Sequence, residues 1–263
     1  MVIVAPGVSA AERESDAQLT QSQRRGLEIF SEMDRRNSGF NDFDVNLTMI
    51  LRTKSGKSSQ RELAISVLEV AKDGDKIMVV FNTPASIRGT ALLSHAHRVG
   101  VDDQWLFLPA LKRVKKIAAR NKSGPFVGSE FSFEDLSAQE LTKDSYEYLR
   151  DETIEGQSFF VVARFALDEY SGYMREVFWL DQSEYRTFKV EYYDHEPEPL
   201  KVLSVADYEQ YEQYEQRFWK PHLMQMRNLR SQKSTDLEWG DYQFNRGLTA
   251  DRDFSVASLR RAR

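Results

Sequence analysis

The sequence predicts a mainly β fold of the α+β class: a strongly curved antiparallel sheet, or unclosed β-barrel, with an N-terminal helix and a helix-loop lid. About a dozen short extended segments follow one another along the chain, separated by turns. Only one segment before them has a helical period, so the strand–helix alternation of a parallel α/β fold is absent. No shift in composition marks a domain boundary. We therefore expect one half-barrel domain over residues 18–263, preceded by a residual signal or flexible arm over residues 1–17.

The helix is expected over residues 18–36. Its apolar residues fall on one side of a 3.6-residue period; they are Leu19, Leu27, Ile29, Phe30 and Met33. The sequence Asn37-Ser38-Gly39 then ends the helix, because asparagine and glycine tolerate the left-handed conformation of a C-cap.

The first strands follow directly. Residues 43–51 alternate between apolar and polar side chains, and Leu63, Ile65 and Val67 repeat the alternation to complete a hairpin. Asp73-Gly74 is typical of a tight hairpin turn, and residues 76–81 then form a strand that is apolar on both faces. Residues 91–98 and 104–108 form a further hairpin. Pro109 ends it, because proline has no N–H to donate to a strand ladder.

The second half of the chain continues in the same way. Strands are expected over residues 146–150, 158–167, 174–180, 186–194, 200–207, 221–229 and 234–245. Residues 132–143 are compatible with a short helix, and residues 251–263 with a closing strand or helix. The polar and aromatic stretch 208–219 receives no assignment.

The connection after Pro109 is long and has an unusual composition. It carries a basic run, Lys112, Arg113, Lys115 and Lys116, and then three aromatic rings, Phe126, Phe131 and Phe133. Long structured connections are more often functional than ordinary turns. Two interpretations stay open: a loop that crosses or lines the mouth of an apolar cavity, or a surface loop pinned to the core by its three Phe side chains. We expect the carboxylates Glu130, Glu134 and Asp135 to neutralise Lys112, Arg113 and Lys115.

A large open sheet that curves must either fill its concave face with side chains or leave a cavity there. One face can pack on the N-terminal helix, and the Phe-bearing loop is available to cover the other. The residues expected to bind lipid in such a cavity are Leu47, Met49, Leu51, Ile77, Val79, Phe81, Trp105, Phe107, Phe126, Phe131, Phe133, Trp179 and Tyr192. Burial of an acyl chain is worth about 0.8 kcal/mol per CH₂, so a cavity of this kind holds lipid without polar chemistry.

Several classes of function are disfavoured. The chain has no cysteine, four histidines, no nucleophile elbow, no phosphate-binding glycine loop and no zinc-protease motif, so we expect neither an enzyme nor a cofactor. His95 and His97 share a strand face as a metal pair would, but no third ligand is evident nearby. A net charge of −5 argues against general affinity for nucleic acid, and no apolar run is long enough to span a bilayer.

The N-terminal residues resemble the end of a secretory signal. Val8-Ser9-Ala10 fits the small-x-small rule for cleavage, here after Ala10, and charged residues follow it. This pattern indicates export to the periplasm. An ordinary flexible arm is the alternative.

Several stretches together resemble a known family, the outer-membrane lipoprotein-sorting-like proteins of bacteria, relatives of the periplasmic lipoprotein carrier of the Lol system. The central ones are residues 89–93 (GTALL), 103–117 (DQWLFLPALKRVKKI), 123–124 (SG) and 128–135 (GSEFSFED). Later matches are 171–173 (SGY), 179–181 (WLD), 189–194 (KVEYYD), 219–221 (WKP), 233–235 (KST) and 237–239 (LEW). The similarity extends from about Gly26 to the C-terminus.

The resemblance implies an unclosed β-barrel with a helical lid, an apolar cavity and a role in outer membrane biogenesis. It also implies a membrane transporter of the resistance-nodulation-division type as a partner. The Trp-Leu-Phe-Leu-Pro and Gly-Ser-Glu-Phe stretches are absent from the characterised lipoprotein carriers, so the cargo is either a lipoprotein or another lipid.

We therefore expect a periplasmic carrier that holds acyl chains, with Lys112, Arg113, Lys115 and Lys116 orienting headgroups or docking a partner. The alternative is a non-enzymatic accessory subunit of an envelope transport complex that acts by protein–protein docking.

Overall fold

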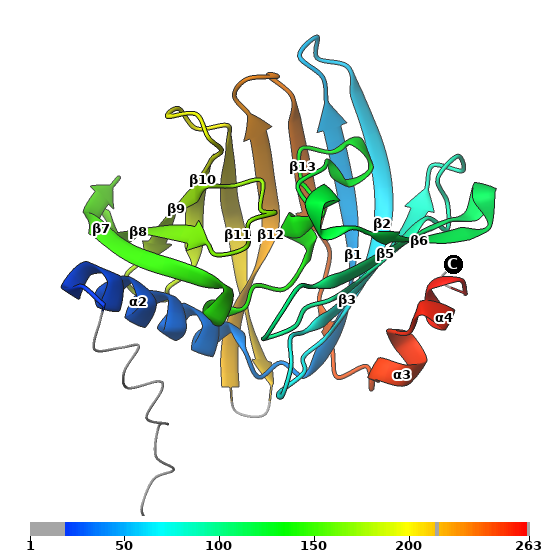
Figure 1. The fold of residues 1–263 in the computed structure, drawn as a ribbon, viewed down its shortest axis with the longest axis horizontal. Coiled ribbons are helices and arrows are strands. Elements are labelled where there is room, and N and C mark those ends of the chain that lie inside the picture. Colours follow the sequence, from blue (N-terminus) through cyan, green and yellow to red (C-terminus); the bar gives the residue numbers. More distant parts are fainter. Residues whose placement is uncertain (1–18, 214–215, 262–263) are drawn as a thin grey trace, which may run out of the picture.

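The computed structural model describes residues 19–213 and 216–261 of the chain, and within them it has a single antiparallel sheet of 14 strands (Figure 1). The strand order is β6-β5-β4-β3-β2-β1-β13-β12-β11-β10-β9-β8-β7, and β14 pairs with β1. The path does not close, so β6 and β7 are its two edges. The predicted mainly β, unclosed architecture is confirmed. The proposed cleavage after Ala10 lies outside the described residues.

The strands of the first half are β1 (Asp42–Arg52), β2 (Ser58–Leu68), β3 (Lys76–Thr83), β4 (Ala91–His95), β5 (Asp103–Leu108) and β6 (Arg113–Ile117). Those of the second half are β7 (Asp144–Ile154), β8 (Gln157–Ala166), β9 (Arg175–Asp181), β10 (Thr187–Tyr193), β11 (Lys201–Gln213), β12 (Gln216–Asn228), β13 (Ser234–Trp239) and β14 (Gln243–Phe244). Pro109 ends β5 as predicted and begins a short 3₁₀ turn.

The N-terminal helix α2 (Gln21–Asn37) lies close to its predicted position. Thr20 caps it by accepting a hydrogen bond from the Gln23 N–H, and the Gln23 side chain accepts one from the Thr20 N–H. Phe30 on its buried face packs on Tyr146 and Phe178, with ring centroids 4.5 and 5.0 Å away. Gly26 lets the helix approach β7 so closely that a Cβ there would lie 2.8 Å from the Glu147 nitrogen.

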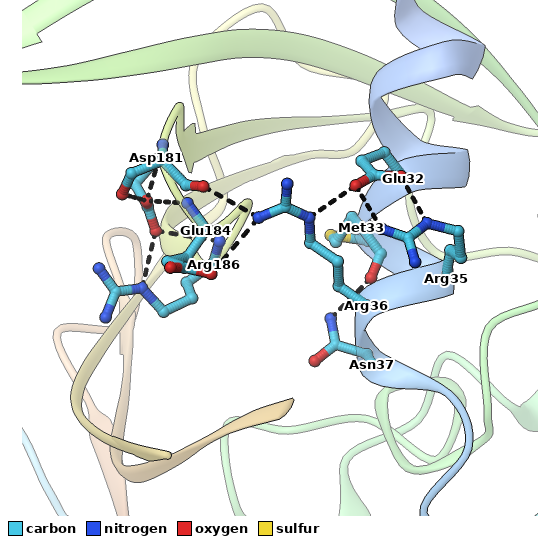
Figure 2. A network of polar contacts seen from close by, with 9 residues as sticks. Glu32, Met33, Arg35, Arg36, Asn37, Asp181, Glu184 and Arg186 are labelled. Carbon is cyan, nitrogen blue, oxygen red and sulfur yellow. Dashed lines mark hydrogen bonds and ion pairs between the residues drawn. The ribbon is translucent and has the colours of Figure 1, made fainter. Parts of the chain in front are cut away.

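The C-terminal end of α2 is fastened to the turn between β9 and β10 (Figure 2). Arg36 donates to Glu32 of the same helix at 2.7 Å and to the Ser183 carbonyl at 2.9 Å. Asp181 holds the turn by accepting hydrogen bonds from Arg186, at 2.9 Å from its Nε. The hydrogen bonds of Arg35 and Arg36 to Glu32 lower the pKa of that carboxyl to about 2.

The inner face of the sheet carries the main core. Alternate residues of β1, such as Val45, Leu47 and Met49, pack there with Ile29 and Phe30 of α2. The same core takes in Phe126 and Phe131 from the connection between β6 and β7. The helix and the Phe-bearing loop therefore cover the same face, which corrects the expectation that they cover opposite faces.

The outer face is covered differently at its two ends. On β3 and β4, Met78, Val80, Ala91 and Leu93 pack against Phe254 and Leu259. These two belong to the C-terminal segment with the short helices α3 (Ala250–Asp253) and α4 (Val256–Leu259). Over β8 and β9, a second outer cluster contains Phe159, Val161, Ala163, Val177 and Trp179. The C-terminal segment, for which the sequence allows a strand or a helix, thus contains helices, and it covers the outer face of β3 and β4.

Candidate functional site

The connection between β6 and β7 crosses the whole inner face. These strands are consecutive in the sequence but form opposite edges of the sheet, so residues 118–143 must pass over its open side (Figure 1). We call residues 118–143 the lid. Apart from 3₁₀ turns at Ala119–Asn121, Phe126–Gly128, Glu134–Leu136 and Leu141–Lys143, the lid has no regular structure. The short helix expected over residues 132–143 is reduced to the last two of these turns.

The aromatic rings of the lid point into the core. Phe126 is 0% exposed and Phe131 is 3% exposed, while Phe133 packs against the same cluster. The Phe126 ring lies 5.5 Å from that of Phe81 on β3 and 5.6 Å from that of Phe133. A tight turn presents these rings, because the Phe126 N–H donates to the Phe131 carbonyl at 2.7 Å. The structure therefore shows the lid pinned to the core through its rings.

Val127, at the tip of that turn, has φ of 47°, a left-handed conformation that β-branched residues rarely adopt. Its carbonyl accepts a hydrogen bond from Arg61 of β2 at 2.5 Å. Burial lowers the pKa of Arg61. An arginine on the inner wall thus holds the lid tip in place.

The carboxylates of the lid bind side chains from the second half of the sheet. Asp135 accepts a hydrogen bond from the Lys201 ammonium at 3.0 Å and a bifurcated one from the Tyr173 hydroxyl, which lies 3.0 Å from each carboxylate oxygen. Glu130 accepts from Asn228 at 2.8 Å, and its carbonyl accepts from Lys201 at 2.9 Å. The expectation that these carboxylates neutralise the basic run is wrong, because the crossing lid carries them away from β6 to β11 and β12.

Glu134 is held in the same way. Its carboxylate accepts hydrogen bonds from the Ser171 hydroxyl at 2.9 Å and from the Gly172 N–H at 3.0 Å. Burial raises the pKa of Glu134, and the charge of neighbouring Asp135 adds to the rise. A Cβ at Gly172 would lie 2.6 Å from the Ser123 Cβ, so only glycine leaves room for the lid here.

The part of the inner face near β7 to β9 is polar. Arg164 donates to Glu176 from its Nε at 2.7 Å and to the lid residue Gln139 from its Nη1 at 2.7 Å. These residues line a cavity of about 80 Å³ under the lid, together with Asp144 and Glu134. The apolar and polar parts of the inner face are therefore both closed by the same segment.

The predicted lipid-binding residues fall into two groups. Ten belong to the main inner core or pack against it: Leu47, Met49, Leu51, Ile77, Val79, Phe81, Phe126, Phe131, Phe133 and Tyr192. Trp105 and Phe107 instead pack on the outer cluster near Phe254, and Trp179 belongs to the other outer cluster. These three rings lie on the opposite side of the sheet, because alternation does not say which face of a doubly apolar strand points inward.

The residues of the basic run also lie on different sides of the sheet. Sequence reasoning treats it as part of a connection, but Arg113–Ile117 form the edge strand β6. Lys115 is paired with Leu106, which packs on the inner core, so Arg113 and Lys115 lie on the inner side of the rim. Lys116 faces outward, 5.6 Å above the Trp105 ring and 2.5 Å from Asp103. Lys112 occupies a left-handed turn position before the strand.

Lys201 and Arg61 were not predicted as site residues. The signal for Lys201 is its spacing: it precedes Leu203 and Val205 at the inward positions of β11, where a charge needs a partner. The signal for Arg61 is similar, since it precedes Leu63 and Ile65 on β2.

A third cation, Lys220 on β12, lies over the rings of Phe40, Phe43 and Phe218 at 4.4, 5.5 and 5.7 Å. Burial lowers the pKa of Lys220 to about 8, and the nearby carboxylates Glu69 and Asp75 oppose the fall.

His95 and His97 make structural contacts. His95 Nε2 is 2.7 Å from the Phe254 carbonyl, and His97 Nδ1 is 2.9 Å from Asp73. Within residues 19–213 and 216–261, no group of three or more His, Cys, Asp or Glu residues is arranged to hold a metal ion. None of the described helices has the length and apolarity that a membrane crossing requires.

Comparisons with known proteins agree with this architecture. A family model described as an uncharacterized protein matches residues 73–261. No curated protein sequence matches significantly. The chain is similar to a domain from Vibrio parahaemolyticus named for outer membrane lipoprotein sorting, with 44% identity, a TM-score of 0.86, and coverage of 90% of this chain and 99% of that one.

Two more distant structures share the fold. A DUF1329 family protein from Desulfovibrio piger is 23% identical, with a TM-score of 0.83 and coverage of 91% of this chain and 100% of that one. A LolA superfamily protein from Nitrosomonas europaea is 20% identical, with a TM-score of 0.70 and coverage of 88% and 98%. The family match over most of the chain and the close relative confirm the resemblance found in the sequence. The chain therefore belongs to the outer-membrane lipoprotein-sorting-like family, whose fold is the LolA-like unclosed barrel.

Proposed function

We propose that the protein is a periplasmic carrier of lipid or lipoprotein that binds acyl chains on the inner face of its sheet after the lid moves aside. One observation carries the proposal: a largely apolar inner face is covered by the helix α2 and one crossing segment, the lid, instead of a second sheet. The name of the Vibrio parahaemolyticus relative supports a role in lipid handling. No catalytic chemistry is part of the proposal.

The energetics allow an acyl chain to replace the lid. Full burial of one Phe side chain contributes about 1.5–3 kcal/mol, so Phe126 and Phe131 together contribute a few kcal/mol to closure. An acyl chain buries about 0.8 kcal/mol per CH₂, so about ten methylenes exceed the contribution of both rings. Since the lid rings fill their part of the inner face, the chain enters by displacing them and not by filling an empty space.

The rim of the sheet would meet the polar end of a lipid or an anionic membrane surface. Arg113 and Lys115 are exposed on the inner side of β6, beside the start of the lid. Cationic side chains near an anionic surface contribute about 1 kcal/mol each. A transporter of the resistance-nodulation-division type, the partner implied by the family resemblance, would deliver or receive the cargo here.

Native mass spectrometry of protein purified without detergent tests the proposal. We expect adducts with lipid masses after loading with phospholipid or with a triacylated lipopeptide, and these two ligands distinguish the two kinds of cargo. The Phe126→Ala variant should load faster, because its lid is held less firmly. Absence of adducts in both proteins under every loading condition would rule out the carrier function.

The free edge of β6 favours a second candidate, an accessory subunit that docks a partner protein. Arg113, Lys115 and Lys116 leave this edge basic on a chain whose net charge is −5. Docking predicts that the Arg113→Glu/Lys115→Glu variant loses partner capture in a pull-down while its lipid loading is unchanged. The matched control is Lys54→Glu/Lys57→Glu, in the exposed turn between β1 and β2.

A further inference from the structure

Lys201 is a buried cation on the apolar inner wall. It is 4% exposed and lies on the same side of β11 as Leu203 and Val205. Its cross-strand neighbour on β10 is the buried Tyr192. A lysine at such a position is costly unless its ammonium is paired and hydrogen-bonded.

The described hydrogen-bond and ion-pair partners of Lys201 both come from the lid. The ammonium donates to the Asp135 carboxylate at 3.0 Å and to the Glu130 carbonyl at 2.9 Å. The wall itself offers two rings, Tyr173 at 4.8 Å and Tyr192 at 5.1 Å from the ammonium. Burial raises the pKa of both tyrosines well above the usual value, so they remain neutral and supply no counter-charge.

Glu176, a buried carboxylate of the inner face, is already engaged. Glu176 accepts from Arg164, with oxygen and nitrogen 2.5 Å apart. When the lid moves aside as the proposed function requires, Lys201 therefore loses its counter-charge and faces an apolar wall. Removing one partner of a buried ion pair is strongly destabilising, and water or a new anion must compensate.

Resting on the proposed carrier function, we propose that the ligand carries an anionic group, a carboxylate or a phosphate, and that it pairs with Lys201 in place of Asp135. In the closed form, side chains of the lid then occupy the positions that the ligand would take. Phe131 occupies the place of acyl carbon, and Asp135, four residues later, occupies the place of the anionic group. The polar cluster at Tyr173 and Lys201 is thus a headgroup site inside the half-barrel, separate from the basic rim.

Three probes with the same alkyl chain test this inference: dodecanoate, dodecyl phosphate and dodecanol. Binding is measured by titration calorimetry below the micelle concentrations of the two acids and the solubility limit of dodecanol, at about pH 8, where both acids are ionised. The wild-type protein should bind at least one anionic probe about tenfold or more tightly than the alcohol, which corresponds to about 1.4 kcal/mol. The better of the two anions identifies a carboxylate or a phosphate as the natural group.

The variants remove the two charges separately and together. Asp135→Asn leaves Lys201 in place and weakens its internal competitor, so affinity for the anionic probe should rise several-fold while affinity for dodecanol changes less. Lys201→Met/Asp135→Asn removes both charges, and the preference for an anion should disappear. Lys189→Met is the control, because the Lys189 ammonium lies over Trp179 on the outer face, and it should leave the preference unchanged.

The outcomes separate the two proposals. Equal binding of all three probes by the wild-type protein and by Asp135→Asn would overturn the headgroup site and leave the carrier function standing. An anion preference that survives in the double variant would also overturn it. Binding of none of the probes by any variant would remove the carrier function and this inference with it. Should the double variant fail to fold, the rise expected in Asp135→Asn is still decisive.

Discussion

Replacing Phe126 with alanine should release the lid without unfolding the sheet. Phe126 is 0% exposed and contacts the rings of Phe81 and Phe133, so its side chain is the deepest anchor of the crossing segment. It belongs to neither edge strand. Its loss therefore weakens lid docking, while the strand ladder from β6 to β7 stays intact.

The size of the effect follows from the burial. Truncation of a buried Phe to Ala costs about 3–5 kcal/mol where the surroundings cannot collapse. A crossing segment without regular structure can adjust, so we expect about 3 kcal/mol. If the lid amides exchange through local opening, this corresponds to roughly a hundredfold faster exchange, at about 1.4 kcal/mol per factor of ten.

Hydrogen–deuterium exchange resolved by peptide is the appropriate assay. Peptides from residues 118–143 should lose protection, while peptides from β1, β2 and β12 should keep theirs. Phe254→Ala is the matched control, because Phe254 is equally buried but packs on the outer face. It should expose the C-terminal helices and leave the lid protected. Uniform loss of protection across the sheet, or unchanged lid exchange in Phe126→Ala, would refute the idea of a separately docked lid.

Three further substitutions have predictable effects. Burial raises the pKa of Asp75 from 3.8 to about 6, so the stability it contributes is present below about pH 4 and is lost as the pH rises through about 6. Asp75→Asn should therefore raise the free energy of unfolding by about 1–3 kcal/mol at about pH 8 and change it little at about pH 4 in urea titrations; equal effects at both pH values would contradict this. Gly26→Ala should lower the melting temperature by several degrees, because its Cβ would lie 2.8 Å from the Glu147 nitrogen, whereas a surface change on α2 should not. Gly172→Ala should speed exchange of the lid, since its Cβ would meet that of Ser123 at 2.6 Å, and a lid as protected as in the wild type would show that the segment adjusts freely.

Most of the fold could be predicted because most strands have a recognisable pattern of apolar and polar residues within their own sequence. The helix α2 has a helical period, and β1 and β2 alternate cleanly. The extension of β11 was missed because Asp207, with φ of 53°, interrupts the pairing with β12 between Ala206 and Tyr208. The register is the same on both sides of this break, but Val205 and Tyr208 both pack toward the core, so the strand loses its period of two. The edge strand β6 was missed because its charges are those of a solvated turn.

The candidate site could be predicted only in part, since its halves are far apart in the sequence. The rings of the lid stand out locally, and Phe126 and Phe131 are buried. Their partners depend on topology: the lid reaches Lys201 only because β6 and β7 are opposite edges. Trp105 and Trp179 were placed on the wrong face for the same reason, because their strands are apolar on both sides and only the tertiary arrangement decides between them.

The connectivity also limits how the lid can act. It is tethered at both edges of the sheet, so it can move off the inner face but stays close to it, and reclosure is an intramolecular event. Its two kinds of contact then differ in what they demand from a ligand. Burial of Phe126 and Phe131 is non-directional, and in the proposed carrier any apolar chain of similar area would replace it. The pairing of Asp135 with Lys201 is directional and charged, and in the proposed carrier an anionic group would replace it. Affinity of the open form would therefore come mainly from the acyl chain, while the choice between ligands would come from the ion pair.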